Sequence, residues 1–415
     1  MRNKSFFLLW TGKLVSSLGD KMYAIAIAWW ILDVTNSPIV MGLYLLAATL
    51  PMVLLGVIAG AIIDRSNLKH ILVIADITRG IGLILIGLLY LGDKLTISNV
   101  FLITISISLA SAFFNPSVTS IIPHIVSKNE CGKANSIIQM VDGIAKVAGP
   151  IIGVAVVTSE GYYVAFMING ISFLASAIFE GFIEYEKGHQ VKKNKTTLRN
   201  TIKNEGVLKD VKVGLQYVYK NSKLMSILFY ILVAHFFIGA ISVMIPFMAK
   251  FISSDNMNLL GILETVLGSG FVVGAFIFSR KSEDKFNVDT LPRIFLLVGY
   301  NFLLIGAIAW FDNLPIILFV VPIFVIGYCV VNASINWRTF IQTDTPTEKL
   351  GRISSISALV GDITLPLSFA LFGFLLDQVN FVILTLISGL LLIMSVLVIS
   401  FIQTNKKETT ESNSY

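Results

Sequence analysis

Residues 39–63 read IVMGLYLLAATLPMVLLGVIAGAII, a run of 25 residues without a charged side chain. A helix rises about 1.5 Å per residue, so about 20 apolar residues cross the hydrocarbon core of a bilayer. The run lies between a turn sequence, Asn36-Ser37-Pro38, and a charged pair, Asp64-Arg65. It therefore predicts a membrane-spanning α-helix.

The same test predicts eleven further spans along the chain. Hydrophobic residues make up 55% of the sequence and charged residues 13%, with a mean hydropathy of +0.81. A soluble domain has about 25% charged residues, so soluble enzymes, disordered chains and nucleic-acid binders are excluded. Cys131 and Cys329 alone do not form a disulfide framework. The expected fold class is an all-α membrane protein with spans at 6–33, 39–63, 71–91, 98–124, 135–157, 162–184, 224–250, 258–279, 292–311, 315–337, 353–376 and 380–402.

The first predicted span differs from a cleavable signal. The segment 6–32 is longer than the apolar core of a signal peptide and carries Lys13, Asp20 and Lys21. We expect it to remain as the first membrane helix.

A long polar segment divides the chain. We expect a six-helix bundle at 1–184, a linker at 185–223, a second bundle at 224–402 and a disordered tail at 403–415. Between Gly206 and Lys223 the linker has apolar residues at helical spacing, which indicates an amphipathic helix on the inner leaflet. A solvated linker with chance periodicity is the alternative.

Two stretches about half a chain apart are alike. Asn115, Gly132-Lys133 and Asp142 in the first correspond to Asn332, Gly351-Arg352 and Asp362 in the second. Such a six-plus-six duplication is how many secondary transporters are built, with substrate bound near the midplane.

The distribution of Lys and Arg predicts the orientation. If the N-terminus is cytoplasmic, 25 of the 31 Lys and Arg residues fall on the inside and two, Lys94 and Lys250, on the outside. The remaining four lie within spans. We therefore expect a multi-pass plasma-membrane protein with both termini in the cytoplasm, and attribute the pI near 9.1 to this bias.

Several motifs resemble those of the major facilitator superfamily. Residues 60–70, GAIIDRSNLKH, resemble its signature loop, with departures at Asn67 and Leu68. Residues 145–153 resemble a motif associated with exporters, although Ala145 and Val154 replace two of its glycines. Other stretches resemble the branch that contains macrolide-efflux and enterobactin-exporter-like proteins: 16–20, 35–42, 122–123, 132–135 and 261–274.

The resemblance covers nearly the whole chain and implies twelve helices in two pseudo-symmetric six-helix bundles, the major facilitator fold. It also implies alternating access, with export of amphipathic compounds driven by inward proton flow. In this family the loop Asp engages the facing half while the cytoplasmic side is shut; a solvated turn is the alternative. The implied gating residues are Gly60, Asp64, Arg65, Lys69, Gly149, Pro150 and Gly153.

Ionisable residues inside spans are costly and mark candidate sites. Asp20, on one face with Tyr23 and Ile27, is expected to line a cavity and bind a cation or a proton, unless a Lys on a neighbouring helix neutralises it. Glu264 lies between Gly261 and Gly268 on a small-residue face that shields it from lipid. It is a proton-coupling candidate or a packing acid.

Other charged residues have local partners. Asp142 precedes Lys146 by four residues and is a proton-coupling candidate, unless the two neutralise each other. Asp76 precedes Arg79 by three residues, and this pair is expected to be structural. Asp362 has Pro366 where its repeat counterpart has Lys146, which makes Asp362 a coupling or gating candidate.

Some residues without charge are also site candidates. Phe236, Phe237 and Tyr23 are candidate cavity aromatics, or ordinary bundle filling. His235 is either titratable or a hydrogen-bonded structural residue. The GxxxG pairs Gly56/Gly60, Gly149/Gly153 and Gly270/Gly274 predict close helix crossings.

The function expected is proton-coupled efflux of drug-like compounds of the macrolide or multidrug type. Export or flipping of a defined metabolite, siderophore or lipid is the alternative, and a receptor or channel is the alternative class. No HExxH, GxSxG or P-loop motif occurs, so neither an enzyme nor an ATP-driven pump is expected. The expected partners are protons, a small amphipathic substrate and the bilayer, without cofactor, metal or nucleic acid, and the chain is expected to be a monomer.

Overall fold

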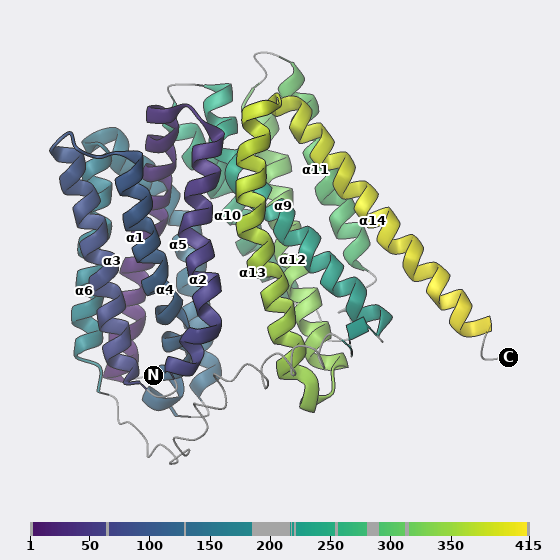
Figure 1. The fold of residues 1–415 in the computed structure, drawn as a ribbon, viewed down its shortest axis with the longest axis horizontal. Helices are drawn as coiled ribbons and strands as arrows, with labels where there is room; N and C mark the ends of the chain where they lie inside the picture. Colours follow the sequence, from purple (N-terminus) through teal and green to yellow (C-terminus); the bar gives the residue numbers. More distant parts are fainter. Residues whose placement is uncertain are drawn as a thin grey trace. The chain divides into compact units, whose positions relative to one another are not determined.

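The computed structural model describes residues 3–63, 66–127, 130–184, 216, 218–219, 221–253, 256–279, 290–311 and 315–412. Within these ranges the chain forms twelve helices and no strand (Figure 1). Each predicted span coincides with one helix, so the all-α membrane prediction is confirmed. The helices are α1 Lys4–Thr35, α2 Pro38–Ile63, α3 Leu68–Leu91, α4 Ile97–Ile125, α5 Cys131–Glu160, α6 Tyr162–Gly181, α9 Ser222–Ile252, α10 Met257–Ser279, α11 Leu291–Trp310, α12 Ile317–Asp344, α13 Thr347–Gln378 and α14 Phe381–Ser412.

Helix α1 differs in composition from the others. In the described part of the chain, eleven helices are long and apolar enough to cross a membrane. α1 is equally long, at 32 residues, but Lys13, Asp20 and Lys21 interrupt its apolar run. The side chain of Asn3 caps its first turn by accepting hydrogen bonds from the N–H groups of Ser5 and Phe6.

Three helices extend by six residues or more beyond the predicted spans. α12 continues to Asp344 rather than ending at 337, α13 begins at Thr347 rather than at 353, and α14 continues to Ser412 rather than ending at 402. The prediction of a disordered tail is therefore wrong over 403–412, where the backbone continues a helix that is already nucleated. The predicted amphipathic helix of the linker lies almost entirely outside the described residues.

Glycine crossings repeat between the two halves of the sequence. Gly80 of α3 lies against the carbonyl oxygen of Gly170 in α6, and Gly299 of α11 lies against that of Gly389 in α14. Both members of the second pair follow those of the first by 219 residues (80 to 299 and 170 to 389). A Cβ atom at any of the four positions would meet the opposite helix within about 3 Å. The duplication predicted from sequence thus reappears in the packing.

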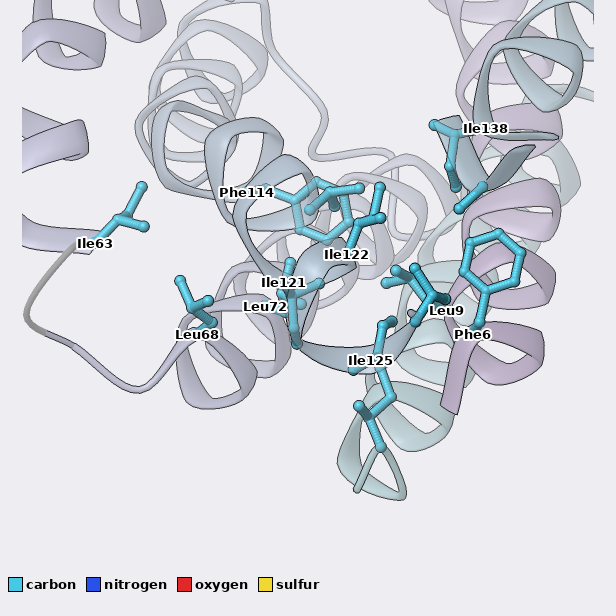
Figure 2. Close-up of a cluster of buried hydrophobic side chains, with 14 of the residues drawn as sticks. Phe6, Leu9, Ile63, Leu68, Leu72, Phe114, Ile121, Ile122, Ile125 and Ile138 are labelled. Atoms are coloured by element: carbon cyan, nitrogen blue, oxygen red, sulfur yellow. The ribbon is translucent and has the colours of Figure 1, made fainter. Parts of the chain in front are cut away.

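A buried apolar cluster packs the first six helices together at the end of the bundle where the chain begins (Figure 2). It includes Phe6 and Leu9 of α1, Leu72 of α3 and Ile121 of α4, each at most 2% exposed. Ile63 and Leu68, which flank the loop between α2 and α3, also belong to the cluster. The core therefore fixes both ends of that loop.

By internal packing, the chain divides into two compact units. Unit 1 comprises Met1–His189, Ser242–Gly268 and Phe369–Asp377, and unit 2 comprises Gln190–Ile241, Ser269–Ser368 and Gln378–Tyr415. Parts of α9, α10 and α13 thus pack with the first six helices. The predicted division at 185–223 remains a prediction.

Candidate functional site

Asp20 is exposed although it lies in the middle of α1. Lys21 and Ala24 beside it are exposed as well, whereas the following residues from Ile25 to Leu32 are buried. An ionised side chain facing hydrocarbon would cost at least about 2.5–3.5 kcal/mol. This patch of α1 therefore requires a polar, water-accessible environment.

Two residues of α6 position the Asp20 carboxylate. The amide Nδ2 of Asn169 donates a hydrogen bond to Oδ1 of Asp20 over 3.3 Å, and Oγ of Ser172 lies 3.2 Å from Oδ1 of Asn169. Asn169 is fully buried and Ser172 nearly so. Neither residue was among the predicted site residues. Their signal is a pair of polar side chains three residues apart in the middle of a mostly apolar span.

Tyr23 and Ile27 do not share the environment of Asp20. Tyr23 is 8% exposed, with its ring 5.6 Å from that of Phe166, and Ile27 is fully buried. The predicted cavity face of Asp20, Tyr23 and Ile27 is therefore wrong. Because residues three and seven positions apart share a helix face, the difference lies along the helix axis. From Ile25 to Leu32 α1 is buried on all sides, and Tyr23, three residues beyond Asp20, already serves as a packing residue.

Asp142 has an ion-pair partner on another helix. Nζ of Lys13 in α1 lies 3.0 Å from Oδ1 of Asp142 in α5. The analysis of local spacing considered Lys146 and could not indicate Lys13, which lies 129 positions away. This cross-helix pair supports the structural interpretation of Asp142.

The exporter-like motif of α5 packs directly on α1. A Cβ atom on Gly149 would overlap the Lys21 side chain, and one on Gly153 would come within 3.0 Å of the Met22 backbone. The predicted close crossing at this glycine pair is confirmed, as is that of Gly270/Gly274, which lie against α12. The motif thereby fixes the stretch of α1 that carries Asp20.

Glu264 is half-buried on α10 within unit 1. Gly261 and Gly268 on either side of it lie against Val154 and Lys146 of α5, which confirms the predicted small-residue face. Oγ1 of Thr265 adds a hydrogen bond to the Val147 carbonyl oxygen at 3.5 Å. Lys21 of α1 is the cation that interacts electrostatically with Glu264. Asp20 and Glu264 thus both interact electrostatically with Lys21.

Asp362 belongs to unit 2 and has a separate environment. Its side chain is exposed, and it interacts electrostatically with His235 and Arg338. His235 packs against Gly361, and its Nδ1 lies 2.8 Å from the Ile231 carbonyl oxygen. The imidazole therefore has a local structural bond and also adjoins an acid.

The two predicted aromatic residues of α9 differ in exposure. Phe237 is 6% exposed and packs against the ring of Phe302 at 5.8 Å, so it is part of the bundle interior. Phe236 is half-buried, with its ring 5.4 Å from that of Phe237, and its carbonyl oxygen accepts a hydrogen bond from Ser368. We therefore retain Phe236 as a substrate-contact candidate and assign Phe237 to packing.

The loop of the family signature is only partly described. Asp64 and Arg65 lie outside the described residues, and the surroundings of Gly60 are likewise not described. Lys69 lines a hollow of about 840 Å³ together with Lys4, His70 and His124. Gly56, predicted to mark a close crossing with Gly60, has open space around it, so that prediction is wrong.

At the end of unit 1 remote from the N-terminus, α1 and α9 are joined by a polar link. Nζ of Lys250 donates to the Leu32 carbonyl oxygen at 2.6 Å and lies 3.3 Å from Oδ1 of Asp33. The Tyr162 hydroxyl donates to Oδ2 of Asp33. The sequence analysis read Lys250 only as a topology charge.

Two glycine contacts in unit 1 lie toward the same helix ends as the link between Asp33 and Lys250. Gly42 of α2 meets Gly373 of α13, and Gly261 of α10 meets Val154 of α5. Each residue of the first contact has its counterpart in the second at an offset of 219 residues (42 to 261 and 154 to 373). Equivalent helices of the two repeats therefore make equivalent contacts, as a pseudo-two-fold arrangement requires.

The described structure holds no group of three or more His, Cys, Asp or Glu side chains suited to a metal ion. Its polar sites are carboxylates on membrane helices, held by amides and cations. Together with the duplicated helices, this defines a membrane protein of the secondary-transporter class.

Comparison with known families agrees with this class. Residues 9–368 match the Major Facilitator Superfamily, and the chain belongs to that superfamily. The chain is therefore a multi-pass transporter.

Relatives of similar length include transporters with named substrates. The chain is 24% identical to the uncharacterized MFS-type transporter YfiS of Bacillus subtilis, covering 99% of this chain and 95% of the relative. It is 19% identical to macrolide efflux protein A of Streptococcus pyogenes, covering 97% and 96%. It is 22% identical to the multidrug efflux pump Tap of Mycolicibacterium fortuitum, covering 88% and 87%.

Solved structures share the fold. A bacterial homologue of the iron transporter ferroportin in an inward-facing state has a TM-score of 0.72 at 16% identity, covering 96% of this chain and 99% of that chain. An inward-facing bacterial homologue of the lysosomal transporter Spinster has a TM-score of 0.70 at 13% identity, covering 95% and 98%. These similarities confirm the major facilitator fold.

Proposed function

We propose that this protein exports small amphipathic, drug-like compounds across the plasma membrane in exchange for protons, by alternating access. Protons are the coupling ion, and the proposal requires no bound cofactor, metal or nucleic acid. The chain acts as a monomer in the bilayer. The substrate class is taken from the macrolide and multidrug efflux relatives.

The observation that carries this proposal is the accessible Asp20 carboxylate in the middle of a membrane helix. Its oxygen is held by the buried Asn169 amide, and Lys21 and Lys13 lie near enough to interact electrostatically. A carboxylate so placed can bind a proton or a cationic substrate, but not both at once. Such mutual exclusion is the physical requirement for exchange.

Two other acids on membrane helices, Glu264 and Asp362, also interact with cationic side chains. Glu264 shares Lys21 with Asp20, and Asp362 adjoins His235 and Arg338 in unit 2. We assign Glu264 and Asp362 to proton coupling and Phe236 to the apolar part of the substrate site. Asp142 is held by Lys13 and supports α1.

The proposed orientation assigns a role to the link between α1 and α9. With both termini in the cytoplasm, Asp33 and Lys250 lie at the outer ends of their helices. The ion pair and the Gly42–Gly373 contact then close the outer side of the transporter. These contacts must separate when the outer side opens.

Transport in proteoliposomes tests the proposal. Vesicles with an acidic lumen are given a macrolide or a fluorescent cationic amphipathic dye, and uptake is measured for wild type, Asp20→Asn, Glu264→Gln and Asp362→Asn. We expect the wild-type protein to accumulate the compound only while the pH gradient lasts. Asp20→Asn should abolish accumulation, because an amide cannot release a proton.

Glu160→Gln is the matched control, because Glu160 is an exposed acid at the end of α5. It should transport as wild type does, and size-exclusion chromatography should show all variants folded. Normal gradient-driven transport by all three site variants would refute the site assignment. Wild-type accumulation that is independent of the pH gradient would refute proton coupling.

A further inference from the structure

Three charged side chains are enclosed in the first six-helix bundle. Asp76 and Arg79 of α3 are 0% and 6% exposed, and Glu180 of α6 is 1% exposed. The Gly80–Gly170 crossing brings α3 and α6 together at the residue that follows Arg79. The proposed transport mechanism does not use this cluster, of which the sequence pattern indicated only the Asp76–Arg79 pair.

Packing fixes the Arg79 guanidinium in place. Its carbon lies 3.8 Å from the ring centroid of Phe114 and 4.3 Å from that of Phe173, and a terminal nitrogen donates to Asp76. An arginine does not give up its proton in a protein. The cluster therefore contains one permanent positive charge that is enclosed by aromatic rings.

If both were ionised, the two acids would carry more negative charge than Arg79 neutralises. Oε2 of Glu180 and Oδ2 of Asp76 are buried and have no hydrogen-bond partner among the described residues. Two carboxylates with one guanidinium would leave a net negative charge without water to solvate it. An enclosed ion costs several kcal/mol even after relaxation. One proton on either carboxyl removes the excess charge and supplies a hydrogen-bond donor.

The neighbouring helices add one further acid to the field of Arg79. Asp20 of α1 interacts electrostatically with both Arg79 and Asp76. The remaining charged neighbours belong to Asp20 rather than to the cluster: Lys21 interacts with Asp20, and Lys13 is paired with Asp142 of α5. Helix α4 contributes the Phe114 ring. Arg79 is thus the cation shared by Asp20, Asp76 and Glu180.

We propose that Asp76, Arg79 and Glu180 form a proton-binding site, in which the two carboxyls hold one proton between them and Arg79 links the site to Asp20. A change of charge at Asp20 alters the field at Arg79 and thereby the affinity of the cluster for its proton. The link to transport rests on the proposed proton-coupled function, whereas the proton site itself does not.

Infrared spectroscopy of the purified protein in lipid vesicles tests the site without a transported compound. The carbonyl stretch of a protonated carboxyl is separate from the bands of carboxylates. Near neutral pH we expect Glu180→Gln and Asp76→Asn each to lose intensity equivalent to one carboxyl. Arg79→Gln should gain the same amount, because both acids must then be protonated. Glu160→Gln, an exposed control, should leave the band unchanged.

A separate measurement tests the electrostatic link between the cluster and Asp20. In Asp20→Asn, the pH at which the Glu180-dependent band disappears should move from its wild-type value, whereas in Glu160→Gln it should not. A band unchanged in both Glu180→Gln and Asp76→Asn would overturn the proton site. An unmoved midpoint in Asp20→Asn would overturn the link. Neither result depends on whether proteoliposomes show proton-coupled efflux, so the two proposals fail separately.

Discussion

Arg79 is the residue on which the enclosed charges of the first bundle depend. It pairs with Asp76, interacts electrostatically with Glu180 and Asp20, and lies between two phenylalanine rings. Only a planar guanidinium can stack between rings and donate in its own plane at the same time. The local spacing of Asp76 and Arg79 predicted their pairing correctly. Glu180 was outside that prediction because it lies about 100 positions away on α6.

We expect Arg79→Gln to destabilise the folded protein by about 3 kcal/mol, the lower end of the range for breaking a buried pair, because both acids can bind protons. Unfolding in a denaturing detergent, followed by circular dichroism, measures the change. Arg293→Gln, at an exposed arginine of α11, should change stability by no more than about 0.5 kcal/mol. Equal stability of the two variants would contradict this account of Arg79.

Helices approach closely where a glycine of one helix meets the backbone of another. The sequence predicted such crossings at three GxxxG pairs, and the structure confirms Gly149/Gly153 and Gly270/Gly274 but leaves Gly56 in open space. The pattern shows only that a helix offers a flat surface. Whether another helix occupies that surface depends on the packing of the whole bundle.

The crossing of α1 and α5 yields a paired prediction. Gly149→Ala should destabilise the protein by about 1–3 kcal/mol, because the added methyl group overlaps the Lys21 side chain. Gly56→Ala should instead stabilise it by up to about 1 kcal/mol, because alanine favours the helix and meets nothing. Thermal unfolding of the purified variants measures both. The same sign of change in both would show that the α1–α5 contact does not govern stability.

On the scale of the molecule, equivalent contacts join equivalent helices of the two repeats. Gly42–Gly373 and Val154–Gly261 correspond at a constant offset, and the ion pair of Asp33 with Lys250 lies toward the same ends. The repeat was predicted from loop and acid motifs alone. The glycine contacts are independent support for it, because they involve other residues.

Cross-linking checks the proposed outer closure. In a background with Cys131→Ser and Cys329→Ser, we introduce Asp33→Cys and Lys250→Cys and add a bifunctional thiol reagent. We expect the cross-link to stop transport, because the outer ends can no longer separate. A monofunctional reagent on the same variant is the control for loss of the ion pair. Full transport after complete cross-linking would rule out a gate at this position.

Labelling of single cysteines checks the orientation. In the same cysteine-free background, a membrane-impermeant maleimide is added to intact cells that carry Lys94→Cys or Lys69→Cys. The positive-inside distribution predicts that only Lys94→Cys is labelled, since Lys69 faces the cytoplasm. Permeabilised cells should label both. The reverse pattern in intact cells would place both termini outside.

The sequence by itself determined the number and the approximate positions of the membrane helices. An apolar run of sufficient length forms a helix in lipid whatever its neighbours are, because its backbone groups must bond within the segment. It also determined the superfamily, through motifs at 60–70 and 145–153, and singled out Asp20, Glu264 and Asp362 as candidate acids. Where a predicted helix end was wrong, as for α14, the residues concerned are polar ones at a helix terminus.

Only the tertiary structure decided which charged and polar side chains meet. Four such pairs are separated by about 100 positions or more along the chain: Asp20 and Asn169, Lys13 and Asp142, Asp33 and Lys250, and Arg79 and Glu180. No helical periodicity relates such residues, and the direction in which a side chain points depends on the rotation of its helix in the bundle. Packing along α1 likewise placed Tyr23 in the core and left Asp20 accessible, although the two residues share a face of the helix.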